Sequence, residues 1–124
     1  MKEVTYLGNE KLLNDLIRNL ITNAIKYGPN KDGHLIISLE EDLEKVTMVF
    51  QDNGIGIDPI NHERVFERFY VVDKSRGNKT GTGLGLALVK NIARLHRGSV
   101  QLESTLGQGS TFTVYLPINH TKVR

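Results

Sequence analysis

Three polar residues in the first part of the chain have types and a spacing that suit a phosphate and metal site. Asn19, Asn23 and Lys26 are four and three positions apart, so a helix would carry them along one edge. An amide oxygen is a hard neutral ligand suited to Mg²⁺, and a lysine one turn away can meet phosphate oxygens. A solvated helix surface fits the same residues, although asparagine is a weak helix former. The spacing leaves both interpretations open.

Asp52 stands at the end of an apolar stretch with strand periodicity. Three apolar residues precede it at every second position, so its carboxylate continues a line of core-facing side chains. Gly54 and Gly56 follow, and they allow the backbone to turn tightly or to approach a flat ligand. The carboxylate can accept a hydrogen bond from an exocyclic amine such as that of adenine, or it can cap its own loop.

A glycine cluster leads into a later expected helix. Residues 81–86 read Gly-Thr-Gly-Leu-Gly-Leu, and free N–H groups at a helix start suit a polyphosphate. The cluster lacks the Lys-Ser/Thr ending of a P-loop, and it differs from GxGxxG because its glycines are spaced by two and follow no strand. A plain hinge at a helix start is the alternative. Positive charge in or beside the preceding stretch comes from Arg68, Lys74, Arg76 and Lys79.

The elements that position these residues are predicted to form one α/β domain over residues 1–124. Asn9 caps a helix that ends near residue 27, and a second long helix covers residues 84–95. Strands are expected at residues 34–40, 45–52, 100–104 and 111–116, with a possible strand at 4–7, a short helix at 61–69 and an irregular stretch at 70–82. The predicted fold is a two-layer α/β sandwich, a mixed, largely antiparallel sheet covered on one face by helices. Apolar residues at helical spacing are Leu12, Leu13, Leu16, Ile17, Leu20, Ile21, Ala24 and Ile25 in the first helix, and Leu84, Leu88, Ile92 and Leu95 in the second.

Composition excludes several classes of protein. The net charge of the 124 residues is +2, which argues against a nucleic-acid or membrane-surface protein. No apolar run approaches the roughly 20 residues of a membrane helix, and the N-terminus has no signal-peptide core. The absence of cysteine fits a reducing compartment. We therefore expect a soluble domain that is not exported.

In chain order, these clusters resemble the boxes of the ATP-binding catalytic domain of sensor histidine kinases. That Bergerat-type domain belongs to an ATPase superfamily that includes gyrase B, the mismatch-repair ATPases and the heat-shock chaperone ATPases. Residues 19–27 resemble its N box, 52–57 its G1 box, 66–70 its F box and 81–86 its G2 box. Residues 107–111 resemble the glycine signature before its last strand.

The resemblance implies a role for each box. Asn23 would coordinate Mg²⁺ with help from Asn19, Lys26 would approach the phosphates, and these three are the catalytic candidates. Asp52 would accept the hydrogen bond of the adenine amino group, and residues 71–82 would form a lid over ATP. Further nucleotide contacts are implied for Tyr27, Gly54, Gly56, Ile57, Arg68, Tyr70, Lys74, Thr80, Gly81, Thr82, Gly83, Leu84, Gly85, Leu86 and Thr111.

The resemblance also implies a function. The domain would bind Mg-ATP and transfer the γ-phosphoryl group to a histidine on a separate dimerisation domain, which passes it to the receiver domain of a response regulator. Hydrolysing members carry a glutamate where this chain has Asn19, and asparagine cannot act as that base. A nucleotide-sensing module without transfer is one alternative, and a gyrase-type ATPase is another, which Asn19 argues against.

The expected setting of the domain follows from the same resemblance. We expect a monomeric cytoplasmic module, without nucleic-acid or direct membrane contact, cut from a longer, membrane-anchored kinase. The chain's own histidines lack the context of an acceptor histidine. They are His34, His62, His96 and His120.

Overall fold

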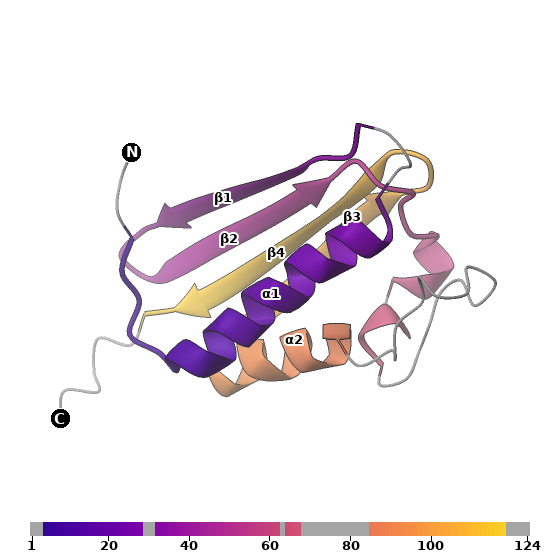
Figure 1. Cartoon of the computed structure of the whole chain (residues 1–124). Coiled ribbons are helices and arrows are strands. Elements are labelled where there is room, and N and C mark those ends of the chain that lie inside the picture. Colours follow the sequence, from indigo (N-terminus) through magenta and orange to yellow (C-terminus); the bar gives the residue numbers. More distant parts are fainter. Residues whose placement is uncertain (1–3, 29–31, 63, 68–84, 119–124) are drawn as a thin grey trace, which may run out of the picture.

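A four-stranded antiparallel sheet carries two helices on one of its faces (Figure 1). The computed structural model describes residues 4–28, 32–62, 64–67 and 85–118. The strand order is β1-β2-β4-β3, and every described pairing is antiparallel. The predicted two-layer α/β sandwich is therefore confirmed, with no parallel pair among these four strands. The elements are α1 (Glu10–Lys26), β1 (Leu35–Glu41), β2 (Lys45–Asp52), the 3-10 turns η1 (Pro59–Asn61) and η2 (Arg64–Phe66), α2 (Gly85–Leu95), β3 (Ser99–Thr105) and β4 (Gly109–Pro117).

The strand register arranges the helix-facing side chains of the sheet in rows that cross the strands. Val46, Met48 and Phe50 alternate as buried residues along β2, as period two requires. The last row before the 52–57 loop is polar instead of apolar: Asp52 lies opposite Ser110, and Ser110 lies opposite Ser104. We call these three residues the polar row.

Helix α1 begins and ends through identifiable hydrogen bonds. The Asn9 side chain accepts from the Leu12 N–H at 3.0 Å, which satisfies one free donor of the first turn. At the other end the Tyr27 N–H donates to the Asn23 carbonyl. The residues that face the sheet are Leu16, Leu20 and Ala24. The sequence prediction was wrong for Ile25, which is 75% exposed because it lies about 100° around the helix from Ala24.

Helix α2 buries a narrower stripe than its sequence predicts. Its buried residues are Val89, Ile92 and Ala93. Leu88 and Leu95 are exposed, since each lies one position away from the line that faces α1 and the sheet. The left-handed residue that ends this region is Arg97, with φ 64°, and the following Gly98 N–H donates to the Ala93 carbonyl at 2.8 Å.

Two smaller elements differ from their predictions. Residues 4–7 form no strand. They run as an extended segment in which Val4 and Tyr6 pack against the core and the Tyr6 hydroxyl donates to the Pro117 carbonyl at 2.9 Å. The short helix predicted at 61–69 is replaced, as far as the structure describes it, by the 3-10 turns η1 and η2. Pro59 at the start of η1 and the Asp58 side chain, which accepts from the Ile60 N–H, favour this tight turn.

Ile92 and Leu95 form a matched pair for testing the helix packing. Ile92→Ala removes a side chain that is 1% exposed, and we expect it to lower the free energy of unfolding by about 2–5 kcal/mol. Leu95 is 63% exposed, so Leu95→Ala should change that free energy by less than about 0.5 kcal/mol. Urea unfolding monitored by circular dichroism measures both values. Similar losses for the two variants would contradict the packing of α2.

The turn between β1 and β2 depends on the Asp42 carboxylate. One of its oxygens accepts from the N–H groups of Glu44 at 2.7 Å and Lys45 at 2.9 Å, and the other lies 3.4 Å from the Lys45 ammonium. These backbone hydrogen bonds, with a smaller contribution from the Lys45 charge, lower the pKa of Asp42 below its ordinary value. The stabilisation is therefore fully present above the unfolded-state pKa and is lost as the pH falls through the folded-state pKa.

We expect the stability difference between the wild type and Asp42→Asn to depend on pH. At neutral pH the wild type should be the more stable, because only the carboxylate strengthens the two backbone hydrogen bonds with a charge. The difference should shrink as the pH falls into the acid range where Asp42 takes up its proton. Urea unfolding at a series of pH values measures it, and a constant difference down to the lowest pH would refute this role of Asp42.

Candidate functional site

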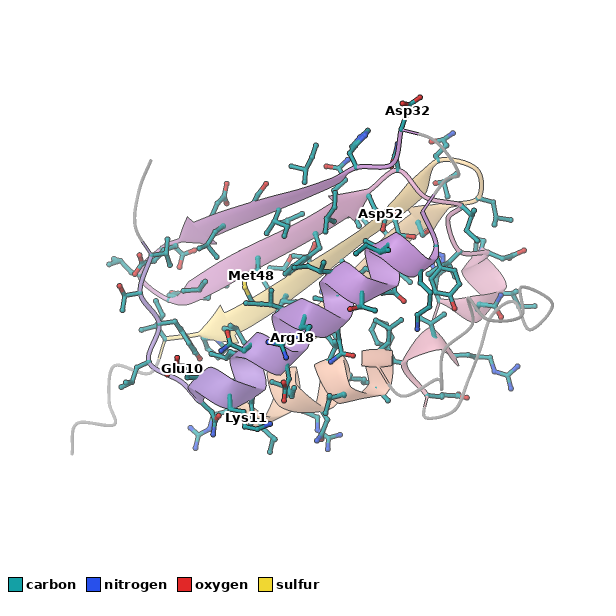
Figure 2. All side chains as sticks on the ribbon, in the orientation of Figure 1. Glu10, Lys11, Arg18, Asp32, Met48 and Asp52 are labelled. Carbon is teal, nitrogen blue, oxygen red and sulfur yellow. The ribbon has the colours of Figure 1, made fainter. Side chains whose placement is uncertain are left out.

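The Asp52 carboxylate joins the end of β2 to the start of β4. Its Oδ1 accepts from the Gly54 N–H at 2.8 Å and from the Ser110 N–H at 3.2 Å. No described residue donates to its Oδ2. Of the two interpretations that the sequence left open, the loop cap is made by Oδ1, and the contact with an adenine amine stays a prediction. Figure 2 shows Asp52 near the C-terminal end of α1, far from Glu10 and Lys11 at the other end.

The 52–57 loop is held between two backbone segments. On one side the Ile55 N–H donates to the Tyr27 carbonyl at 3.0 Å, and on the other the Gly107 N–H donates to the Ile55 carbonyl at 2.8 Å. The loop passes so close to both that side chains do not fit. A Cβ on Gly54 would collide with the Tyr27 carbonyl oxygen, and a Cβ on Gly56, whose φ is +78°, would collide with the Thr105 carbonyl oxygen. Both glycines are thus required by close backbone approach.

The edge of α1 that carries Asn19 faces the first turn of α2. The Asn19 Nδ2 donates to the Asp15 carbonyl at 2.7 Å. Its Oδ1 lies 2.9 Å from where a Cβ on Gly85 would stand, so a larger residue there would require the Asn19 side chain to shift. Asn23 and Lys26 follow on the same edge and are half-buried. The structure therefore brings the end of the predicted glycine cluster against the predicted metal and phosphate edge.

Three residues predicted to contact the nucleotide make contacts within the domain, and their nucleotide contacts stay predictions. The Ile57 side chain is buried in the core, and its N–H donates to the Ser104 hydroxyl at 2.7 Å. Leu86 packs against the core. Thr111 pairs with Gln51 and Glu103, and strand alternation places it on the sheet face away from the helices. Ser110, one position earlier, stands in the polar row instead.

Phe66 is fixed in the aromatic cluster beside α2. Its ring meets the Phe112 ring edge-on, with centroids 6.1 Å apart, and the Lys90 ammonium lies 6.0 Å from its centroid. This contact ties the turn η2 to β4 and α2. The predicted lid at 71–82 lies outside the described residues. So do the predicted contacts Arg68, Tyr70, Lys74, Thr80, Gly81, Thr82, Gly83 and Leu84.

Ser104 and Ser110 lie in the polar row with Asp52, and the sequence reasoning did not name them as candidate site residues. The Ser104 hydroxyl donates to the Gly109 carbonyl at 2.9 Å and lies 2.7 Å from the Ser110 hydroxyl. A signal was present in the sequence: each serine occupies a position of the alternating apolar face of its strand, as Asp52 does. Polar residues on that face of three strands indicate a shared polar patch, but only the register shows that they are neighbours.

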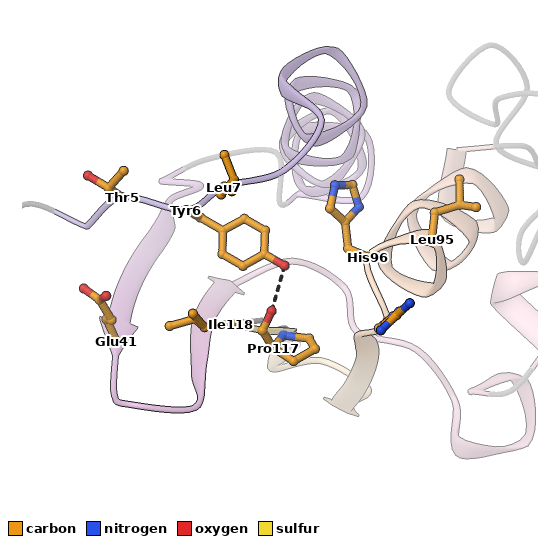
Figure 3. A pocket seen from close by; sticks show the side chains of 9 residues that line it. Thr5, Tyr6, Leu7, Glu41, Leu95, His96, Pro117 and Ile118 are labelled. Carbon is orange, nitrogen blue, oxygen red and sulfur yellow. Dashed lines mark hydrogen bonds between the residues drawn. The ribbon is translucent and has the colours of Figure 1, made fainter. Parts of the chain in front are cut away.

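A pocket at the opposite end of β4 is separate from the polar row (Figure 3). It has a volume of about 510 Å³, and its lining includes Tyr6, His96 and Pro117. Burial raises the pKa of the Tyr6 phenol, and its hydrogen bond to the Pro117 carbonyl shows that it serves packing. His96 is also fully engaged: its Nε2 accepts from the Asn9 N–H at 3.1 Å, and its Nδ1 lies 2.9 Å from the Ile92 carbonyl.

The side chains that most often bind metals in proteins are not clustered in the part of the chain that the structure describes. There, no group of three or more histidine, cysteine, aspartate or glutamate side chains is placed to hold a metal ion. The described helices also include none with the length and apolar character needed to span a membrane.

Known proteins similar to this chain are sensor histidine kinases. Sensor histidine kinase RppB of Synechocystis sp. is 49% identical over 117 residues, which make up 94% of this chain and 26% of RppB. This chain thus spans about a quarter of the length of that relative. The structure of the mycobacterial sensor histidine kinase MprB matches with a TM-score of 0.75 and 29% identity, covering 90% of this chain and 76% of MprB.

A further structure and a family profile agree with these matches. Full-length ShkA, crystallised in complex with AMPPNP, matches with a TM-score of 0.77 and 30% identity, covering 91% of this chain and 23% of ShkA. The profile described as histidine kinase-, DNA gyrase B-, and HSP90-like ATPase matches residues 8–120. The resemblance to the catalytic domain of sensor histidine kinases is confirmed, and the chain belongs to the family of histidine kinase-, DNA gyrase B- and HSP90-like ATPases.

Proposed function

We propose that this chain binds Mg-ATP and transfers its γ-phosphoryl group to a histidine on a separate dimerisation domain. The observation that carries ATP binding is the geometry at Asp52. Two backbone N–H groups hold Oδ1, and Oδ2 is left as an oriented, charged acceptor for one exocyclic amine. ShkA, which matches over 91% of this chain, was crystallised with the ATP analogue AMPPNP, and this supports the assignment.

The phosphate chain would lie toward the edge of α1 that faces α2. Asn23, with Asn19, offers amide oxygens to Mg²⁺, and the phosphate oxygens of the nucleotide would complete the coordination. Lys26 at the last turn of α1 adds a positive charge, and Arg68 and Lys74 are proposed phosphate contacts. The ion would neutralise charge on the phosphates, while the chain's own residues hold them in line for transfer.

Asn19 favours phosphoryl transfer over hydrolysis. Its Nδ2 is engaged with the Asp15 carbonyl and its Oδ1 lies beside Gly85, so the orientation of the amide is set and its oxygen faces the start of α2. A neutral amide cannot take a proton from water. A site without such a base suits phosphoryl transfer, in which water must be kept away while another domain supplies the acceptor histidine.

The proposal places the chain in a larger protein. Two of the described histidines, His62 and His96, have ring nitrogens hydrogen-bonded to backbone groups of this chain, which does not suit a phosphoryl acceptor. The acceptor would therefore come from the dimerisation domain of the same kinase, and a receiver domain would take the phosphoryl group onward. Residues 71–82 are proposed as the lid, and the whole kinase is proposed to be membrane-anchored with this domain in the cytoplasm.

Asp52→Asn tests the adenine contact without removing the loop cap. The amide oxygen can still accept from Gly54 and Ser110, but the outward group becomes an NH₂ donor that opposes the adenine amine. We expect ATP to bind roughly ten- to hundredfold more weakly, as for the loss of a hydrogen bond to a charged acceptor of about 1.5–3 kcal/mol. Isothermal titration calorimetry with Mg-ATP measures the change.

Asp58→Asn is the matched control for that experiment. Asp58 lies on the same connection and caps η1 through the Ile60 N–H at 3.0 Å. The variant should bind ATP within about twofold of the wild type. If Asp52→Asn also retained full affinity, the assignment of Asp52 to adenine would be wrong.

Transfer itself is tested by adding the acceptor. Mixing the chain with a histidine-bearing dimerisation domain and labelled Mg-ATP should give an acid-labile phosphoryl group on that domain. Asn23→Ala should slow labelling at least roughly tenfold, because a metal that orients and neutralises phosphates is worth several kcal/mol. Asn14→Ala, an exposed asparagine on the same helix, should label at the wild-type rate.

Other outcomes would point to the alternative functions. If ATP bound but no label reached the histidine of any tested dimerisation domain, the chain would be a nucleotide-sensing module. Rapid steady-state phosphate release by the chain alone would instead indicate a gyrase-type ATPase, despite Asn19.

A further inference from the structure

The hydroxyl of Ser104 makes three hydrogen bonds, and in two of them the partner fixes the direction. The Ile57 N–H can only donate to it, at 2.7 Å, and the Gly109 carbonyl can only accept from it, at 2.9 Å. A serine hydroxyl has one proton and two lone pairs. When the Ser104 proton is on the Gly109 carbonyl, its third contact, with the Ser110 hydroxyl at 2.7 Å, uses the remaining lone pair. In that arrangement Ser110 is the donor and Ser104 the acceptor.

With its proton donated to Ser104, the Ser110 hydroxyl can only accept further hydrogen bonds. Ser110 is 7% exposed, so few other groups can reach its oxygen, and its N–H is already bound to Asp52 Oδ1. Beside it, Oδ2 of Asp52 is also an acceptor. We call the end of the polar row formed by Asp52 and Ser110 the ligand corner. It thus presents hydrogen-bond acceptors and no side-chain hydroxyl proton.

We propose that Ser104 is a selectivity-determining positioning residue, which makes this corner prefer a 6-amino purine to a 6-oxo purine by holding the proton of Ser110 away from the ligand. The inference rests on the proposed binding of ATP at Asp52. A 6-amino group donates and matches the two acceptors, either directly or through one water. A 6-oxo group brings lone pairs toward them and finds no proton. Ser104 would contact neither the 6-amino nor the 6-oxo purine, because it acts through Ser110.

The ratio of the affinities for Mg-ATP and Mg-ITP measures this role. Hypoxanthine carries a 6-oxo group and an N1–H where adenine carries a 6-amino group and a bare N1. The N1–H is present in every measurement with Mg-ITP, so the change in the ratio between wild type and variant reports the contact at position 6. In Ser104→Ala the Ser110 hydroxyl is released and can turn its proton toward the 6-oxo group. We expect the ATP-to-ITP affinity ratio to fall about five- to tenfold, the factor of one neutral hydrogen bond. Ser104→Thr, which keeps the hydroxyl, should restore the ratio. Ser99→Ala, an exposed serine of the same strand, should leave it unchanged.

A double-mutant cycle separates positioning from general loosening of the loop. If Ser104 acts through Ser110, Ser104→Ala should not change the ratio further in a Ser110→Ala background. A loop that is merely less stable would weaken both nucleotides equally and leave the ratio at its wild-type value. If Ser104→Ala does not fold, Ser110→Ala alone decides the question, because an unchanged ratio there removes the mechanism.

The outcomes distinguish this inference from the proposed function. If the wild-type chain binds neither nucleotide, the proposed function is wrong and the inference fails with it. If the wild type prefers ATP but Ser104→Ala keeps the same preference, only the inference is overturned. The same holds if Ser104→Ala lowers the ratio equally with and without Ser110.

Discussion

Two backbone N–H groups converge on one oxygen of Asp52, and the ligand corner depends on this junction. The Gly54 N–H comes from the loop that follows β2, and the Ser110 N–H comes from the start of β4. A partly buried carboxylate needs such donors to offset its lost hydration. By using both lone pairs of Oδ1, the protein fixes the direction in which Oδ2 points. One interaction therefore closes the loop and also orients the oxygen that we propose as the adenine acceptor.

The 52–57 loop is hydrogen-bonded to several neighbouring segments as well as to itself. It is hydrogen-bonded to the end of α1 through the Tyr27 carbonyl and to the β3–β4 turn through the Gly107 N–H. Ser104 adds a third attachment at the Ile57 N–H. Helix end, loop and turn are therefore mutually dependent, and the asparagine edge of α1 is positioned by the same contacts that position Asp52. This explains why chemistry-bearing residues that are far apart in the sequence form one site.

Much of the fold could be predicted from apolar periodicity, and the failures have physical reasons. Lys45–Asp52 was predicted with its exact bounds because alternation and burial agree there. Ile25 and Leu95 were placed in the core because periodicity gives a stripe but not its width, which depends on how much sheet lies beneath the helix. The segment at residues 4–7 has strand-like residues, but a strand needs a partner, and sequence alone does not show whether one is adjacent.

Some residues of the candidate site could be recognised from the sequence, and others could not. Asp52, Gly54 and Gly56 stood out because a carboxylate on an apolar face and closely spaced glycines are unusual. Ser104 and Ser110 did not, since serine is common in strands and their meaning depends on register. Thr111 was named from its place in the glycine signature, while the register puts its neighbour Ser110 opposite Asp52.

The segment before α1, residues 4–9, is attached to the rest of the domain at two points. Near the start of the chain, Tyr6 is hydrogen-bonded to the end of β4, and Asn9 is hydrogen-bonded to His96 just after α2. These two ties attach the segment to both layers of the domain before α1 begins. A force applied to the chain at Val4 is thus divided between sheet and helices instead of bending the backbone at residue 9.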